Sequence, residues 1–153
     1  EAMWIVKCSR CGFDPWGLGL FLLIMLPNLA WFALPAPNDI LRAESAAPLL
    51  DGLGQCLQII MVAALCLLVN VSRDRPIKRG FAAGAALCAT LYFAGWAGYY
   101  AGAASAGVIL TLCLAPCGAF LLFSLARGNA PALLAAAGFT LCHLGSTIIT
   151  FIL

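Results

Sequence analysis

Five long apolar segments, separated by short polar ones, make up most of this chain. They cover residues 16–34, 52–71, 81–102, 105–126 and 132–153. Each is close to the roughly 20 residues that an α-helix needs to cross the hydrocarbon core of a bilayer. Pro35 and Pro37 end the first segment, and Gly128 and Pro131 precede the last. The pattern predicts an all-α, polytopic transmembrane helical bundle of about five spans, preceded by a short N-terminal segment at residues 1–15.

Composition supports the same interpretation. Hydrophobic residues make up 64% of the chain and charged residues only 9%, against roughly a quarter charged in soluble domains. These few charged residues cannot cover the surface of a soluble core of this size. The apolar surface must therefore face lipid. The first apolar segment, at about 19 residues, exceeds the 7 to 15 of a signal peptide's apolar region, and we interpret it as a span.

The basic residues predict the orientation, because short cytoplasmic loops carry an excess of Lys and Arg. With the N-terminus inside, seven of the eight basic residues are cytoplasmic: Lys7, Arg10, Arg73, Arg75, Lys78, Arg79 and Arg127. Only Arg42 is outside. We therefore expect a cytoplasmic N-terminus. The cations mark membrane boundaries and do not interleave with aromatic residues, so no nucleic-acid partner is expected.

Polar side chains within the apolar segments are the candidates for function. Asn28 follows Pro27 in the first span, and an amide in lipid must find a partner, either in a neighbouring helix or in a bound molecule. Asp51, Gln55 and Gln58 form one stripe on the second span because they recur at helical spacing. His143 lies near the middle of the last span.

Aromatic residues form a second stripe on the third span, at Tyr92, Trp96, Tyr99 and Tyr100. An interfacial aromatic belt explains Tyr99 and Tyr100, but it explains Tyr92 poorly. We expect Asn28, Gln55, Gln58, Tyr92, Trp96 and His143 to converge in the outer half of the bundle and to line one ligand-binding pocket. The structural alternative is that ordinary contacts between helices satisfy these groups, His143 included.

The cysteines are weaker evidence for a metal site than the polar and aromatic stripes are for a pocket. Cys8 and Cys11 have the spacing of one half of a zinc site, but a closed structural site needs four ligands, so zinc would require a second chain. An unliganded reduced pair and a thiol redox pair are the alternatives, and no cofactor is expected. Cys113, Cys117 and Cys142 with His143 could bind a soft metal, although buried cysteine more often acts as a small apolar residue.

Glycines at positions 80, 84, 95, 98 and 102 give the third span a face on which helices can approach closely, within the chain or in a homo-oligomer. Motifs for nucleotide binding, zinc proteolysis and serine hydrolysis are absent, which favours a protein that is not an enzyme.

Four stretches resemble a group of small uncharacterised bacterial integral membrane proteins: Leu26-Pro-Asn-Leu-Ala-Trp-Phe, Gly95-Trp-Ala-Gly-Tyr-Tyr-Ala-Gly, Cys113-Leu-Ala-Pro-Cys and Cys142-His. The resemblance implies a multi-pass protein of the bacterial plasma (inner) membrane and assigns no activity. We expect a protein that binds a small molecule or lipid in its outer half and could pass it across. The alternatives are an accessory subunit of a membrane complex and, third, a membrane thiol oxidoreductase.

Overall fold

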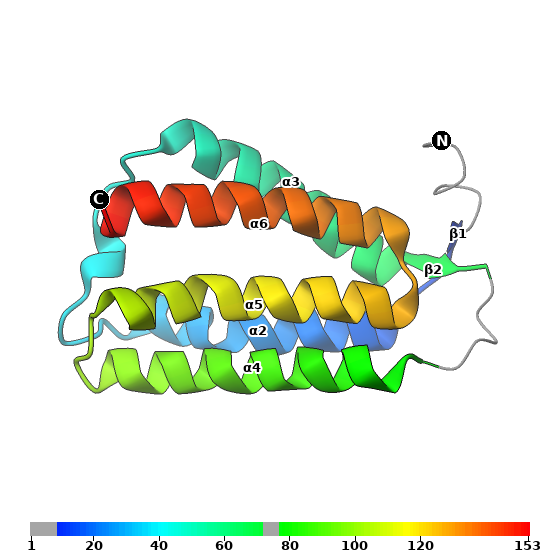
Figure 1. Cartoon of the computed structure of the whole chain (residues 1–153), viewed down its shortest axis with the longest axis horizontal. Helices are drawn as coiled ribbons and strands as arrows, with labels where there is room; N and C mark the ends of the chain where they lie inside the picture. The colour runs from blue at the N-terminus through cyan, green and yellow to red at the C-terminus, as the bar shows by residue number, and fades with distance from the viewer. Residues whose placement is uncertain (1–8, 72–76) are drawn as a thin grey trace.

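Five long helices run along a common direction in the computed structural model, which describes residues 9–71 and 77–153 (Figure 1). They are α2 (Pro15–Ala33), α3 (Pro48–Leu67), α4 (Arg79–Tyr100), α5 (Ala106–Arg127) and α6 (Ala130–Phe151). All five are long and apolar enough to cross a membrane. A 3₁₀ helix, η1 (Ile40–Arg42), lies in the loop between α2 and α3. The predictions of an all-α fold and of five helices of membrane-spanning length are confirmed.

Helix α3 is shifted by four residues from the second predicted span, while the other four helices agree with their predicted spans to within two residues. Helix α3 begins four residues earlier than expected, with Pro48 at its first turn, where a missing N–H costs nothing. It also ends four residues earlier. Leu68–Asn70 leaves the helix to form strand β2, which pairs antiparallel with strand β1 (Ser9–Cys11).

Local sequence explains why α5 and α6 meet in a tight turn. Gly128 has a φ of 63°, a left-handed conformation that glycine adopts without strain, and it ends α5. Asn129 then caps α6 by accepting a hydrogen bond from the backbone N–H of Ala132 at 3.1 Å. The same Asn129 side chain donates to the carbonyl oxygens of Ala64 and Leu68, at 2.9 and 2.8 Å. One residue therefore starts α6 and satisfies carbonyls at the end of α3.

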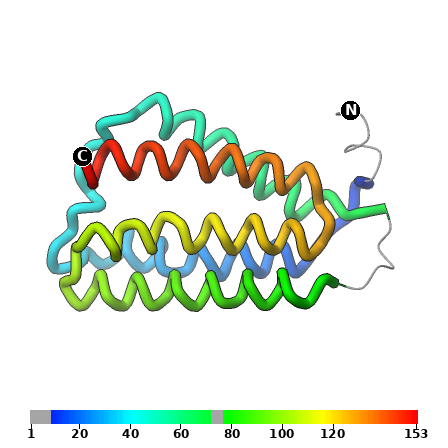
Figure 2. Tube along the Cα trace, viewed as in Figure 1, coloured from blue at the N-terminus to red at the C-terminus, as the bar shows by residue number. Residues whose placement is uncertain are grey.

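The helices pack in two groups that diverge toward one end. Helix α3 packs along α6, α4 packs along α5, and α5 joins the groups by packing against α6, while α2 contacts α3, α4 and α5. Helices α2 and α3 touch closely near Gly17, where an added Cβ would lie only 2.5 Å from the carbonyl oxygen of Leu65. Figure 2 shows α3 and α6 separating from the other helices toward the opposite end.

Each end of the bundle has its own polar network, and we name the two ends by their acidic residues. At the Asp14 end, Arg127 donates from Nε to Oδ2 of Asp14 at 2.6 Å, and Asp14 also caps α2 at the N–H of Trp16. At the Asp39 end lie the loop from α2 to α3, the turn from α4 to α5, and the C-terminus (Figure 1). Polar groups thus gather at the ends of the helices.

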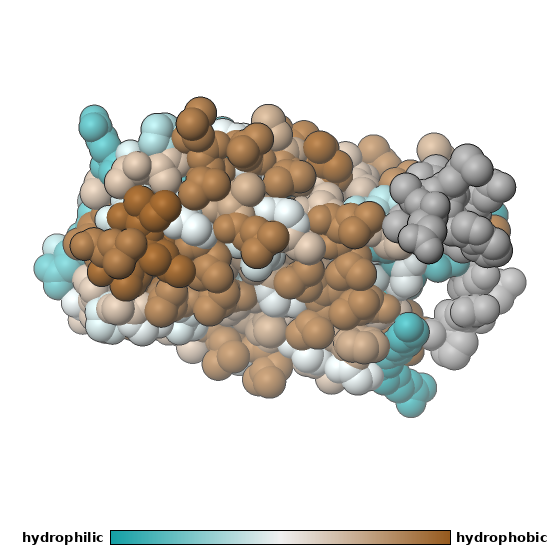
Figure 3. Space-filling model, turned by 45° about the horizontal axis from the view of Figure 1, so that its top comes forward, coloured by the Kyte–Doolittle hydropathy of each residue, from teal (hydrophilic) through white to brown (hydrophobic). Residues whose placement is uncertain are grey.

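The long sides of the bundle are apolar. On the face in Figure 3, hydrophobic residues cover the middle and hydrophilic residues gather toward both ends. Helix α2 exposes Leu22, Leu26 and Leu29, and α6 exposes Leu134 and Leu141. Soluble monomers rarely expose so large an apolar surface to water, whereas lipid solvates it favourably. This surface suits a multi-pass membrane protein.

Candidate functional site

A cavity of about 550 Å³ lies between the diverging helices, in the half of the bundle nearest the Asp39 end. All five helices contribute to its wall, and Leu41 of η1 closes part of it. Two of the lining side chains are exposed, Phe32 of α2 and Gln55 of α3. The cavity therefore opens to the outside between α2 and α3, on a long side of the bundle.

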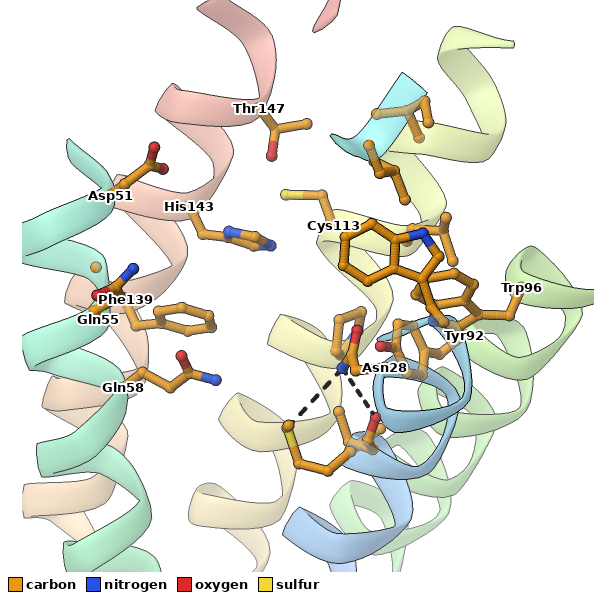
Figure 4. Close-up of a pocket in the computed structure, with 18 of the residues that line it drawn as sticks. Asn28, Asp51, Gln55, Gln58, Tyr92, Trp96, Cys113, Phe139, His143 and Thr147 are labelled. Atoms are coloured by element: carbon orange, nitrogen blue, oxygen red, sulfur yellow. Dashed lines mark hydrogen bonds between the residues drawn. The ribbon is translucent and has the colours of Figure 1, made fainter. Parts of the chain in front are cut away.

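The wall formed by α3 and α6 is polar (Figure 4). Asp51, Gln55 and Gln58 descend along α3, and His143 lies on the facing part of α6. Ser146 donates a hydrogen bond to Oδ1 of Asp51 at 2.5 Å. Within the described part of the chain, the side chains of Gln55, Gln58 and His143 make no hydrogen bond. The imidazole of His143 instead stacks on the ring of Phe139, with centroids 5.1 Å apart.

The wall formed by α2 and α4 is aromatic. Trp96 is its centre, with ring centroids 6.3 Å from Trp31, 6.3 Å from Tyr92 and 5.7 Å from Tyr99. Trp96 is only 6% exposed; its Nε1 lies near the Tyr92 hydroxyl, but it makes no hydrogen bond of acceptable geometry among the described residues. Tyr99 is 1% exposed, so its ring faces the interior of the bundle and not the lipid.

Asn28 of α2 lies on the aromatic side of the cavity, beside Tyr92 (Figure 4). Its amide nitrogen donates to the carbonyl oxygen of Ile24 at 3.4 Å and lies 4.0 Å from the sulfur of Met25, both in its own helix (Figure 4). The side chain of Tyr92 lies next to it. The Asn28 amide is within reach of the Tyr92 hydroxyl of α4, and it faces the cavity.

Asp39 organises the cap over this end of the cavity. Its carboxylate accepts hydrogen bonds from Trp31 Nε1 at 2.8 Å, from the Tyr99 hydroxyl at 3.0 Å and from Arg42 Nε at 2.6 Å. Burial by itself would raise the pKa of Asp39, but these hydrogen bonds outweigh it and lower the pKa below its usual value of 3.8. Tyr99 also accepts from the backbone N–H of Leu41, which fixes η1 over the cavity.

The fold brings all six predicted site residues to this one cavity: Asn28, Gln55, Gln58, Tyr92, Trp96 and His143. Their convergence is geometric, and their role in binding is taken up below as a proposal. Helical periodicity located these residues because each stripe lies on one face of its helix, and those faces border the cavity. Sequence reasoning missed Trp31 and Phe139, which also line the cavity, because nothing in an apolar run distinguishes an aromatic residue that faces a cavity from one that faces lipid.

The structure describes only one of the two cysteines of the predicted metal site. Cys8 lies outside the described residues, and Cys11 is an exposed, unpaired thiol in β1. Across residues 9–71 and 77–153, no three His, Cys, Asp or Glu side chains gather where they could hold a metal ion. Cys113 lines the cavity, while Cys117 is buried outside that lining.

The glycine face of α4 is used mainly inside the chain. A Cβ at Gly84 would lie 3.0 Å from Leu122, and one at Gly95 would lie 3.2 Å from Leu112, both on α5. Gly80 and Gly98 have open space around them. These glycines explain the close packing of α4 on α5, and contact with a second chain stays a prediction.

Comparison with protein families, with curated proteins and with solved structures finds no match to this chain.

Proposed function

We propose that this chain is a plasma-membrane protein, with a cytoplasmic N-terminus, that binds a small molecule or lipid in the cavity near its Asp39 end. The orientation rests on the basic residues. Among the described residues, Arg10, Lys78, Arg79 and Arg127 belong to the Asp14 end and Arg42 to the Asp39 end. Under the positive-inside rule, the cavity then lies in the outer half of the membrane. The resemblance noted above favours a bacterial inner membrane.

The observation that carries the proposal is a set of polar groups around the cavity that have no partner in the described protein. Gln55, Gln58 and His143 make no hydrogen bond there, and Trp96 Nε1 is buried without making one. Leaving a polar group unsatisfied in an apolar medium costs on the order of 1–3 kcal/mol by mutational measures. Four such groups around one space favour a cavity filled by water together with a polar ligand.

The shape of the cavity also favours binding. A volume of about 550 Å³ is within the usual range for small-molecule sites, which combine apolar walls with a few polar groups. The opening beside Phe32, which is 68% exposed, gives access from the lipid. Toward the Asp14 end, the contact of Gly17 with Leu65 closes α2 against α3. This arrangement supports binding more directly than passage across the membrane.

The test is whether purified protein carries a molecule that depends on the polar wall. Wild type, His143→Phe and the double variant Gln55→Leu/Gln58→Leu are purified in parallel and examined by native mass spectrometry and by chemical analysis of extracts. Thr90→Val serves as the matched control, since Thr90 is exposed and bonds only its own helix, at the carbonyl of Ala86. We expect a bound molecule in wild type and in the control, and less of it in the cavity variants.

Thermal stability separates binding from packing. His143→Phe keeps an aromatic ring to stack on Phe139, so the fold should tolerate it. If the cavity variants retain every molecule found in wild type and only lose stability, the polar residues serve packing and the proposal is wrong. In that case an accessory role in a membrane complex becomes the better hypothesis.

A further inference from the structure

The charge on the cavity wall indicates the chemical class of the ligand. We propose that the cavity binds an organic cation, with a substituted ammonium group placed toward Asp51 and an apolar body lying against the aromatic wall. This inference rests on the proposed function above and deepens it, because it names the ligand class that the same cavity selects.

Asp51 is the only Asp, Glu, Lys or Arg among the described residues that line the cavity. Its carboxylate accepts the hydrogen bond from Ser146 on Oδ1, and its Oδ2 has no partner within the described part of the chain. Asp51 lies in the first turn of α3, where the helix dipole stabilises a negative charge. One carboxylate oxygen is therefore free to meet a cationic group.

Arg42 and Arg127, at the two ends of the bundle, already have acidic partners other than Asp51. Arg42, on the same end of the bundle, donates to Asp39 at 2.6 Å and to the carbonyl oxygen of Trp31 at 2.7 Å. Arg127 belongs to the opposite end and is bound to Asp14. In the described structure no Lys or Arg pairs with Asp51, and His143 is within electrostatic reach of its carboxylate. The site would repel an anionic ligand and attract a cationic one.

The opposite wall suits the rest of such a ligand. Arg42 already lies over the Trp31 ring, 4.7 Å from its centroid, and the rings of Trp31, Tyr92 and Trp96 offer apolar area against which the body of the ligand can pack. Trp96 Nε1, buried and without a hydrogen bond, can donate to an oxygen of the ligand or to a water beside it.

The position of Asp51 along α3 is compatible with an amphiphilic ligand. Asp51 lies in the first turn of α3, at one end of a helix long and apolar enough to span a bilayer. The exposed lining residues Phe32 and Gln55 lie on the long sides of α2 and α3. An amphiphilic cation partitions into a bilayer with its charge at the level of the lipid headgroups. It can enter sideways without crossing the cap that Asp39 holds.

Three probes with one chain length test the inference: decyltrimethylammonium, decanol and decyl sulfate. Each is titrated into protein in maltoside micelles, and binding is followed by tryptophan fluorescence and by the shift in thermal midpoint. We expect the cation to bind wild type most tightly. In Asp51→Asn, where the amide oxygen can still accept from Ser146, half-saturation by the cation should need at least about tenfold more probe.

Two controls keep the charge effect apart from folding. Glu44→Gln removes an acidic charge from the exposed loop at the same end and should leave cation binding unchanged. Ser146→Ala removes the hydroxyl but keeps the carboxylate, and should bind the cation within about threefold of wild type. Native mass spectra from nanodiscs with and without phosphatidylcholine identify where the bound ammonium group comes from. A retained choline lipid shows that it is a lipid headgroup, and absence of that lipid points to a free cation.

Failure of this inference differs from failure of the proposed function. If decanol binds wild type as tightly as the cation, or if Asp51→Asn keeps wild-type affinity for the cation, the ligand is not selected by charge and the inference is wrong. Binding lost in His143→Phe would still support the cavity as a site. If none of the probes binds wild type and no molecule co-purifies, both proposals are wrong.

Discussion

The ion pair between Asp14 and Arg127 offers the sharpest test of the fold. It joins residues 113 positions apart in the chain, and ties the start of α2 to the end of α5 with Nε and Oδ2 only 2.6 Å apart. The Asp14 side chain is 4% exposed and that of Arg127 is 20% exposed. The perturbation is a double-mutant cycle of Asp14→Asn, Arg127→Gln and both together.

The burial of the two partners sets the expected magnitude. Removing one partner of a buried pair costs about 3–5 kcal/mol, while exposed pairs contribute about 0–1 kcal/mol. Because Arg127 retains some exposure, we expect Asp14→Asn to cost about 3 kcal/mol and the coupling between the two sites to be about 2 kcal/mol. Asparagine caps helices as well as aspartate does, so the capping bond to Trp16 should not contribute.

The assay is reversible unfolding in mixed micelles with increasing dodecyl sulfate, followed by circular dichroism. Arg79→Gln is the matched control, because it removes a positive charge at the same end from an exposed residue; it should change stability by less than about 0.5 kcal/mol. A coupling below about 0.5 kcal/mol between Asp14 and Arg127, or an equal cost for Arg79→Gln, would refute the reasoning.

Four further predictions follow from single features. Gly17→Ala should destabilise the protein by about 1–3 kcal/mol in the same assay, since its Cβ would lie 2.5 Å from a backbone oxygen, whereas Gly19→Ala has open space and should be neutral or slightly stabilising. The pKa of Asp39 is lower in the folded protein than the value near 3.9 expected on unfolding. Its ionised carboxylate therefore stabilises the fold above the unfolded pKa, and this contribution is lost as pH falls through the folded pKa. The loss of stability in acid should be smaller in Asp39→Asn. Reporter fusions after Glu44 should be active outside the cytoplasm and those after Lys78 inside, and the opposite pattern would contradict the orientation. Mass spectrometry of alkylated, unreduced protein should find no stoichiometric intramolecular disulfide, and a defined pair would favour thiol redox chemistry instead.

The sequence alone determined the membrane-spanning elements and the inward stripes. An apolar run of about 20 residues has few alternatives to a helix in lipid, because every backbone polar group must be satisfied within the segment. Helical spacing then put Asp51, Gln55 and Gln58 on one face, and Tyr92 with Trp96 on another. Those faces turned inward because polar side chains are costly against lipid.

Contacts between distant segments were decided only by the tertiary structure. The pairing of β1 with β2 shortened α3, although Leu68–Asn70 continues its apolar run. The bonds from Asn129 to the end of α3 and from Asp39 to Tyr99 join residues about 60 positions apart. No local pattern encodes such partners. The cavity depends on such contacts too, because it lies between the close packing of α2 on α3 at Gly17 and the cap at Asp39, where α3 and α6 diverge from the other helices.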